Sequence, residues 1–93
     1  MNEIEEANFN KGNFERANLK KSNFKEDNLK KSNLIGAEFI KYNLKESNFE
    51  GANLHGAHFI SFGQLSKVKT LHNTKLNGDI LKSLKEKHLT LFE

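Results

Sequence analysis

The fold is decided by residues 7–24, which read ANFNKGNFERANLKKSNF. A large apolar residue returns every five positions in this stretch, and the same phase holds without a skip on both sides of it. The apolar positions are Ile4, Phe9, Phe14, Leu19, Phe24, Leu29, Leu34, Phe39, Leu44, Phe49, Leu54 and Phe59. A stride of five suits neither common element, because a strand alternates every second residue and an amphipathic helix every third or fourth. The stride instead predicts a solenoid with one short side per five residues.

Two other places in the five-residue unit carry a signal. A small residue stands two places before most apolar positions, as Ala7, Gly12, Ala17, Ser22, Ser32, Ala37, Ser47, Ala52 and Ala57. Asparagine stands immediately before most of them, as Asn8, Asn13, Asn18, Asn23, Asn28, Asn33, Asn43, Asn48 and Asn53. We expect the large and the small residue to point inward. The Asn side chain is expected to satisfy backbone groups at the corners.

The motif Ala-Asn-Leu/Phe-x-x, seen at residues 7–9, 17–19 and 52–54, resembles that of the pentapeptide-repeat proteins. The resemblance implies an all-β solenoid, a right-handed quadrilateral β-helix with four units in each coil. Twelve units then give about three coils. It also implies that residues twenty apart lie on adjacent coils, so that Tyr42 and Phe62 stack. Asp27 occupies an inward place, where we expect corner backbone amides or the Ser47 hydroxyl to hold it.

We divide the chain into a repeat β-helix over residues 1–61 and a C-terminal capping segment over 62–93. Gly63 and Gln64 interrupt the repeat, and Leu65, Val68, Leu71 and Leu76 follow in an irregular linker. A capping α-helix is predicted at about 78–88. Asn77 is expected as its N-cap, with Asp79 in the first turn and Lys85 and Lys87 near the end. No comparable cap precedes Ile4, so the N-terminal end is a candidate contact surface.

The sequence offers little for catalysis. The chain has no cysteine, which excludes disulfides and thiolate metal sites. The candidate bases are His55, His58, His72 and His88, and the first two belong to different sides of the coil. In the inferred register His58 lies one coil from Glu38, a pair expected to be an ordinary solvated contact. We therefore predict no enzyme, no metal site and no cofactor.

The net charge of +3 lies entirely in residues 62–93, because nine basic and nine acidic residues cancel over 1–61. The lysines are spread over all sides of a coil, so we expect no nucleic-acid partner. Residues 1–6 lack the features of a secretory signal, and no apolar run is long enough to span a membrane. We expect a cytoplasmic protein with no membrane partner.

The most informative surface signal is apolar. Ile35, Ile40 and Ile60 occupy outward places, and Leu91 and Phe92 end the chain. These five residues form the candidate interaction surface of a non-enzymatic protein-binding or scaffold module, with self-association as a homodimer among its options. The C-terminal segment folding back over the isoleucines is the alternative.

Two other functions stay open. Some pentapeptide-repeat proteins mimic DNA and bind type II topoisomerases such as DNA gyrase. Here the corresponding acidic row is Glu6, Glu26 and Glu46, which Lys25 and Lys45 flank. The other reading is a structural fragment of a longer protein.

Overall fold

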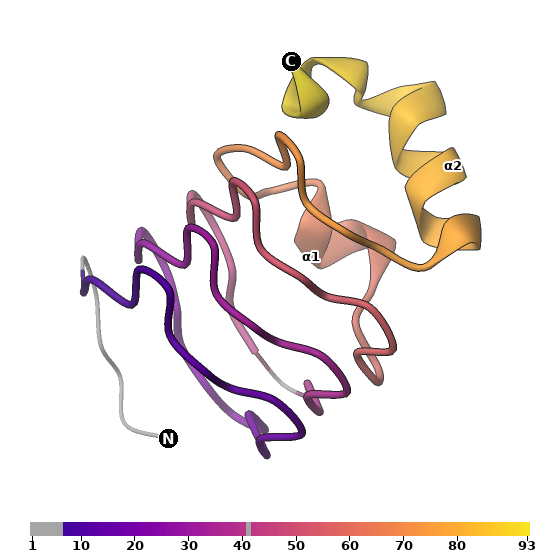
Figure 1. The fold of residues 1–93 in the computed structure, drawn as a ribbon. Coiled ribbons are helices and arrows are strands. Elements are labelled where there is room, and N and C mark those ends of the chain that lie inside the picture. Colours follow the sequence, from indigo (N-terminus) through magenta and orange to yellow (C-terminus); the bar gives the residue numbers. More distant parts are fainter. Residues whose placement is uncertain (1–6, 41) are drawn as a thin grey trace.

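The computed structural model describes residues 7–40 and 42–93, and in it the repeats wind into stacked coils (Figure 1). Isolated parallel β-bridges connect each coil to the next at a spacing of twenty residues, for example Asn8 to Asn28 and Asn28 to Asn48. Each bridge is a single residue pair, so the described residues form coils joined by bridges instead of extended strands. The predicted apolar position at Ile4, the predicted bare end around it and Glu6 of the acidic row lie outside the described residues.

Nine sides of the described coils are built by the same local geometry. The Asn side-chain Oδ1 accepts a hydrogen bond from the backbone N–H two residues later, at 2.9–3.1 Å, in the units of Asn8, Asn13, Asn18, Asn23, Asn28, Asn33, Asn43, Asn48 and Asn53. The next residue takes a left-handed conformation, as at Lys11 (φ 60°) and Glu46 (φ 59°). The predicted role of the Asn side chains at the corners is therefore confirmed.

This geometry makes a direct prediction for Asn48. Its Oδ1 accepts from the Glu50 amide at 2.9 Å. Asn48→Ala removes that acceptor and is expected to lower the free energy of unfolding by about 0.5–1.5 kcal/mol. Urea denaturation measures the change, and Asn10→Ala is the control because Asn10 is exposed and lies outside the Asn position. Equal effects of the two substitutions would contradict the corner role.

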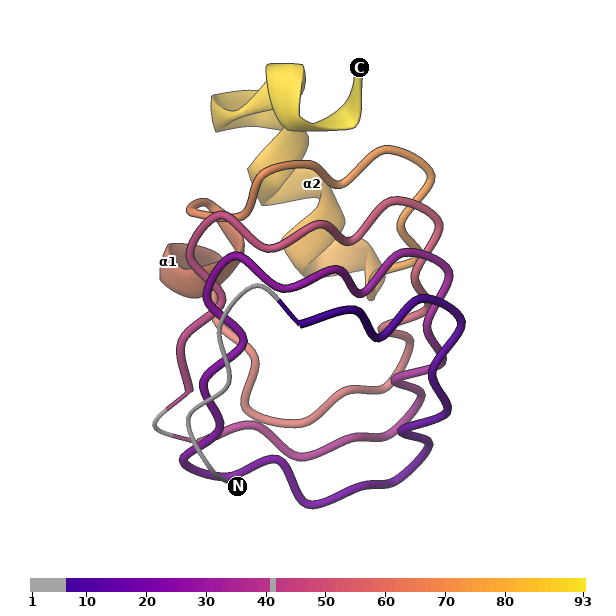
Figure 2. The same ribbon diagram turned by 90° about the vertical axis from the view of Figure 1, so that its left-hand side faces the viewer.

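The core is a column of the apolar positions. Phe24, Leu34, Phe39, Leu44 and Phe49 are completely buried. Figure 2 shows the coils one behind another, each running round the same interior. The small positions lie inside as well, with Ser22, Ser32, Ala37, Ser47 and Ala52 at 2 % exposure or less.

Asp27 is buried in its small position, as its place in the repeat predicts. Its Oδ1 accepts a hydrogen bond from the Ala7 amide on the preceding coil at 2.8 Å. A backbone amide therefore holds this carboxylate, one of the two expected options. The Ser47 hydroxyl donates instead to the Leu44 carbonyl at 2.6 Å.

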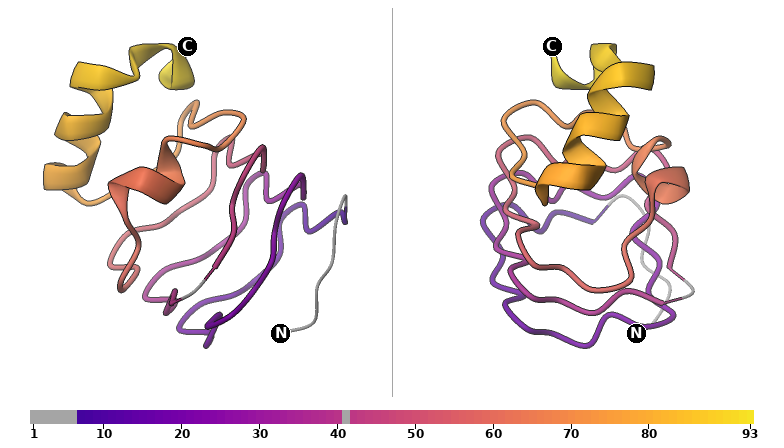
Figure 3. Two further views of the ribbon diagram at one scale, coloured as in Figure 1. Left: turned by 180° about the vertical axis from the view of Figure 1, so that it is seen from behind. Right: turned by 90° about the vertical axis from the view of Figure 1, so that its right-hand side faces the viewer.

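Helix α1 spans Phe62–Leu65 and lies at the side of the solenoid (Figure 3). The coil pattern then resumes, which the sequence did not predict. Parallel bridges join Asn48 to Thr70 and Asn53 to Lys75, now at a spacing of twenty-two residues. The Thr70 hydroxyl accepts from the His72 amide at 3.1 Å, as an Asn side chain does in the repeats. Leu71 is completely buried at the corresponding apolar position.

Helix α2 spans Gly78–Lys87, within the range of about 78–88 that the sequence predicts, and a 3₁₀ helix, η1, follows at Leu89–Phe92. Both lie over the C-terminal end of the solenoid (Figure 3). Leu84 of α2 is completely buried, and the Leu71 amide donates to the Leu91 carbonyl at 2.7 Å. Asn77 stands at the N-cap, but its side chain accepts from the Gly56 amide at 2.9 Å instead of capping the helix.

Candidate interaction surface

The five residues of the predicted surface lie in two places. Ile40 is 37 % exposed, and Ile35 and Ile60 are half-buried, with Ile60 packed against the core. Leu91 and Phe92 are half-buried in η1, where they pack against the core at the C-terminal end. The isoleucines thus lie on the repeat coils, and the last apolar residues lie in η1 at the C-terminal end.

Phe59 is the largest departure from the sequence prediction. It keeps the phase of the apolar positions, which predicts an inward side chain. The structure instead turns it outward, with 67 % of its surface exposed. Its backbone is left-handed, with φ of 63°, a conformation that costs a residue with a Cβ atom about 1–2 kcal/mol. The prediction that Phe59 belongs to the core is wrong.

Tyr42 explains why Phe59 leaves the core. Its ring packs edge-on against Phe39, with centroids 5.2 Å apart, and so fills interior space beside the residue on which Phe59 would stack. Its hydroxyl accepts from the Ser61 amide at 2.7 Å and lies 3.2 Å from the Ser61 Oγ. The expected stack of Tyr42 on Phe62 is therefore wrong, because the Phe62 ring lies in α1 and packs against His88 at 5.5 Å.

The residues around Phe59 form a definite surface, which we name the Phe59 corner and define as Ile40, His58, Phe59 and Ile60. A parallel bridge joins Glu38 to His58. Ile40, which follows Glu38, and Ile60, which follows His58, therefore lie at the same corner of adjacent coils. The His58 ring lies 6.3 Å from the Phe59 ring. Glu38 forms its ion pair with Lys20 at 3.6 Å, so this carboxylate lies beside a lysine on the previous coil.

A hollow lies between α1 and α2. Its volume is about 480 Å³, and it is lined by Phe62, Asp79, Ile80, Ser83 and Lys87. The exposed edge of Phe62 and the half-buried Ile80 make it mainly apolar. This hollow could not be predicted from the sequence, because the position of α1 against α2 depends on the resumed coil.

The repeat sequence identifies the family. The family model described as Pentapeptide repeats matches residues 4–26 and 28–60, as eight copies. The chain belongs to the pentapeptide-repeat family. Proteins of this family form β-helix solenoids and are generally non-enzymatic structural or binding modules. No curated protein and no solved structure matches the chain.

The Phe59 corner departs from the regular pentapeptide repeat in its structure, although its residues lie within the part of the chain that matches the family model. Residues 28–60 match the repeat through to the end, and Phe59 lies among them. The sequence at Phe59 therefore follows the repeat pattern even though its side chain points outward. The only hints in the sequence are the bulky Tyr42 at a small position and the break of the repeat after Ser61.

The histidines of this pentapeptide-repeat protein do not converge. His72 Nδ1 lies 3.2 Å from the Phe92 carbonyl, and His88 packs on Phe62. Across residues 7–40 and 42–93, no three His, Asp or Glu side chains are grouped so as to hold a metal ion. In the same part of the chain, no helix has the length and apolar character needed to cross a membrane.

Proposed function

We propose that this pentapeptide-repeat protein is a right-handed quadrilateral β-helix that acts as a non-enzymatic protein-binding module. The Phe59 corner is its contact surface. The observation that carries the proposal is the 67 % exposure of Phe59 in a left-handed backbone conformation. A left-handed residue is ordinary at the corners of this solenoid, so the exposure of the aromatic ring is the distinguishing feature, and exposed apolar side chains concentrate where proteins bind partners. An aromatic ring at the same corner as Ile40 is also the kind of anchor that dominates the energetics of interfaces.

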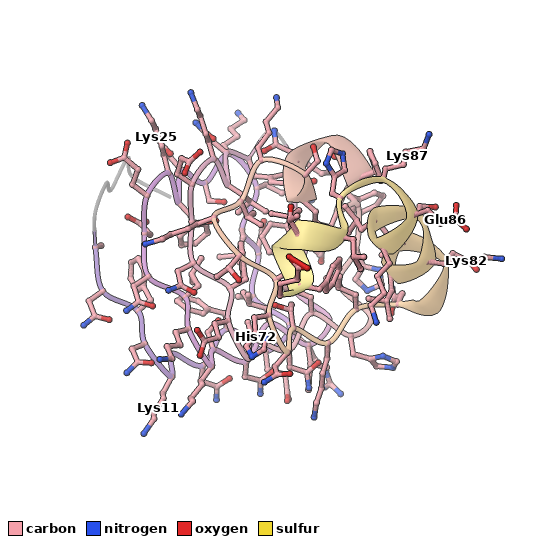
Figure 4. The ribbon with its side chains drawn as sticks, turned by 90° about the horizontal axis from the view of Figure 1, so that it is seen from above. Lys11, Lys25, His72, Lys82, Glu86 and Lys87 are labelled. Atoms are coloured by element: carbon pink, nitrogen blue, oxygen red, sulfur yellow. The ribbon has the colours of Figure 1, made fainter. Side chains whose placement is uncertain are left out.

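The charge distribution supports a protein partner over a nucleic acid. Lys11 and Lys25 project from opposite sides of the solenoid (Figure 4). Lys20 and Lys30 each lie 3.6 Å from a carboxylate on the next coil, Glu38 and Glu50 respectively. A phosphate backbone is best bound by unpaired cations that share one face.

The alternative function is that of a DNA mimic that binds a type II topoisomerase such as DNA gyrase. The observation in its favour is a cleft of about 410 Å³ to which Glu26, Asp27 and Glu46 contribute from adjacent coils. Lys69 lines the same cleft, which weakens its acidic character. A supercoiling assay in which high concentrations of the protein neither inhibit nor protect the topoisomerase would remove this alternative.

The proposed surface is tested by crosslinking in the cells that express the protein. A photoreactive p-benzoylphenylalanine replaces Phe59 in one variant and Leu89 in the other. Leu89 is the matched control because it is also exposed, at 57 %, but lies in η1. We expect a discrete crosslinked protein from position 59 that position 89 does not give, and Ile40→Lys should abolish it. Identical products from both positions, or none from position 59, would contradict the proposal.

A further inference from the structure

The backbone at the first described coil has unused hydrogen-bonding groups. In later coils each bridging residue directs both of its backbone groups toward the preceding coil. Asn28, for example, donates to the Ala7 carbonyl at 2.8 Å and accepts from the Phe9 amide at 2.7 Å. The same geometry directs the N–H and C=O groups of Asn8, Asn13 and Asn18 away from the solenoid. Within the described part of the chain, the amides of these three residues donate to no group.

This edge is complementary to itself. A residue that presents both its N–H and its C=O pairs with an identical residue in an antiparallel arrangement, because such a pair exchanges both hydrogen bonds. A two-fold axis through the Asn13 side makes the two edges run antiparallel. Asn13 then faces Asn13 of the second copy, and Asn8 faces Asn18. The edge therefore fits a second copy of this chain.

The side chains at this edge agree with the same pairing. With Asn13 opposite itself, Lys11 lies opposite Glu15 of the second copy, and this contact occurs twice. Both side chains are exposed, and neither takes part in an ion pair found among the described residues. Glu15 Oε1 accepts a hydrogen bond from the neutral Asn33 side-chain amide on the next coil at 3.3 Å. The dimer thus brings two opposite charges together without breaking an ion pair, and the second oxygen of the Glu15 carboxylate can accept from Lys11 while the first keeps its Asn33 hydrogen bond. A shift that places Asn13 opposite Asn18 would instead bring Lys11 opposite Lys20, so the charges disfavour that register.

The two ends of the solenoid differ in how far their apolar side chains are covered. At the first coil Phe9 and Phe14 remain half-buried, although they pack edge-on against Phe24 at 5.7 and 6.1 Å. At the other end α2 and η1 cover the last coil, and the Leu71 amide is used by Leu91. Stacking of the first coil of one copy on the last coil of another is therefore blocked by the cap.

We propose that the edge formed by Asn8, Asn13 and Asn18 is a homodimer interface, in which two copies pair antiparallel about a two-fold axis. It lies on a different face from the Phe59 corner and does not depend on it. The transverse extents of 22 × 22 Å give an end face of about 500 Å² per partner, below the ~800 Å² per partner of a standard interface. The dimer is accordingly weak and depends on concentration.

Sedimentation velocity between about 10 and 500 µM tests the interface, because a dimer of this size is expected to dissociate in that range. Glu15→Lys places two lysines opposite each other and should raise the dissociation constant at least about tenfold. The charge swap Lys11→Glu/Glu15→Lys should restore the dimer. Lys45→Glu is the matched control, since Lys45 occupies an exposed corner two coils away and should leave the dissociation constant unchanged.

Other outcomes overturn the inference. A protein that stays monomeric throughout the concentration range would contradict the inference. So would a dissociation constant that Glu15→Lys leaves unchanged, or one that the charge swap fails to restore. A dimer that Phe59→Ser splits but Glu15→Lys does not would assign self-association to the Phe59 corner and reject the edge. Thermal melting of each variant shows that the solenoid is folded, so that a change in mass reports on the interface.

Discussion

Phe39→Ala is expected to lower the free energy of unfolding by about 3–5 kcal/mol, whereas Phe59→Ala should change it by no more than about 0.5 kcal/mol. The two residues occupy the same place in the five-residue unit, twenty positions apart. Phe39 is completely buried and packs against Tyr42, so that its truncation leaves a cavity. Phe59 is 67 % exposed, and its truncation removes little buried surface.

Urea denaturation followed by circular dichroism measures both changes. Phe59→Gly provides a further check, because glycine adopts a φ of 63° without strain. We expect Phe59→Gly to be at least as stable as Phe59→Ala. A loss of several kcal/mol for Phe59→Ala would show that the ring is inside the solenoid and that the Phe59 corner does not exist.

Leu71→Ala is expected to cost about 2–5 kcal/mol, the second large effect. Leu71 is completely buried in the resumed coil and lies between two flanking bridges, at Thr70 and Lys75. The neighbouring Thr74 hydroxyl donates to the Phe49 carbonyl at 2.7 Å, which ties this segment to the third coil. A residue in a loosely packed linker would not have this effect.

The control for Leu71 is Leu89→Ala in the same C-terminal segment. Leu89 is 57 % exposed, and we expect its substitution to cost less than about 1 kcal/mol. Similar midpoints for the two variants would mean that residues 66–76 do not continue the solenoid, and that the cap begins where the sequence repeat ends.

The sequence was most informative where one local rule repeats. The stride of five predicted the buried column from Leu19 to Leu54, because each unit contributes the same inward side chain. The repeated asparagines predicted the corner hydrogen bonds, since their short side chains reach the backbone amide two residues later. Both features depend on contacts within a unit or with the next coil, and both are therefore visible in the pattern.

The sequence failed where a side chain from one unit displaces one from another. Phe59 keeps the pattern, and its outward turn depends on the Tyr42 ring that lies beside Phe39 in the preceding coil. The resumed coil was missed because Thr70 and Lys75 replace the expected asparagines and α1 adds two residues to the spacing. The Asn77 side chain likewise bonds the distant Gly56 amide in place of its own helix.

The outward turn of Phe59 is the central claim, and proton NMR of the intact protein tests it most directly. Nuclear Overhauser effects report which aromatic rings lie within about 5 Å, a range that includes the close ring edges of an aromatic pair. We predict strong effects between the rings of Tyr42 and Phe39, whose centroids are 5.2 Å apart, and none between Phe59 and Phe39. Strong effects between Phe59 and Phe39 would place Phe59 in the core column and contradict the proposed binding surface.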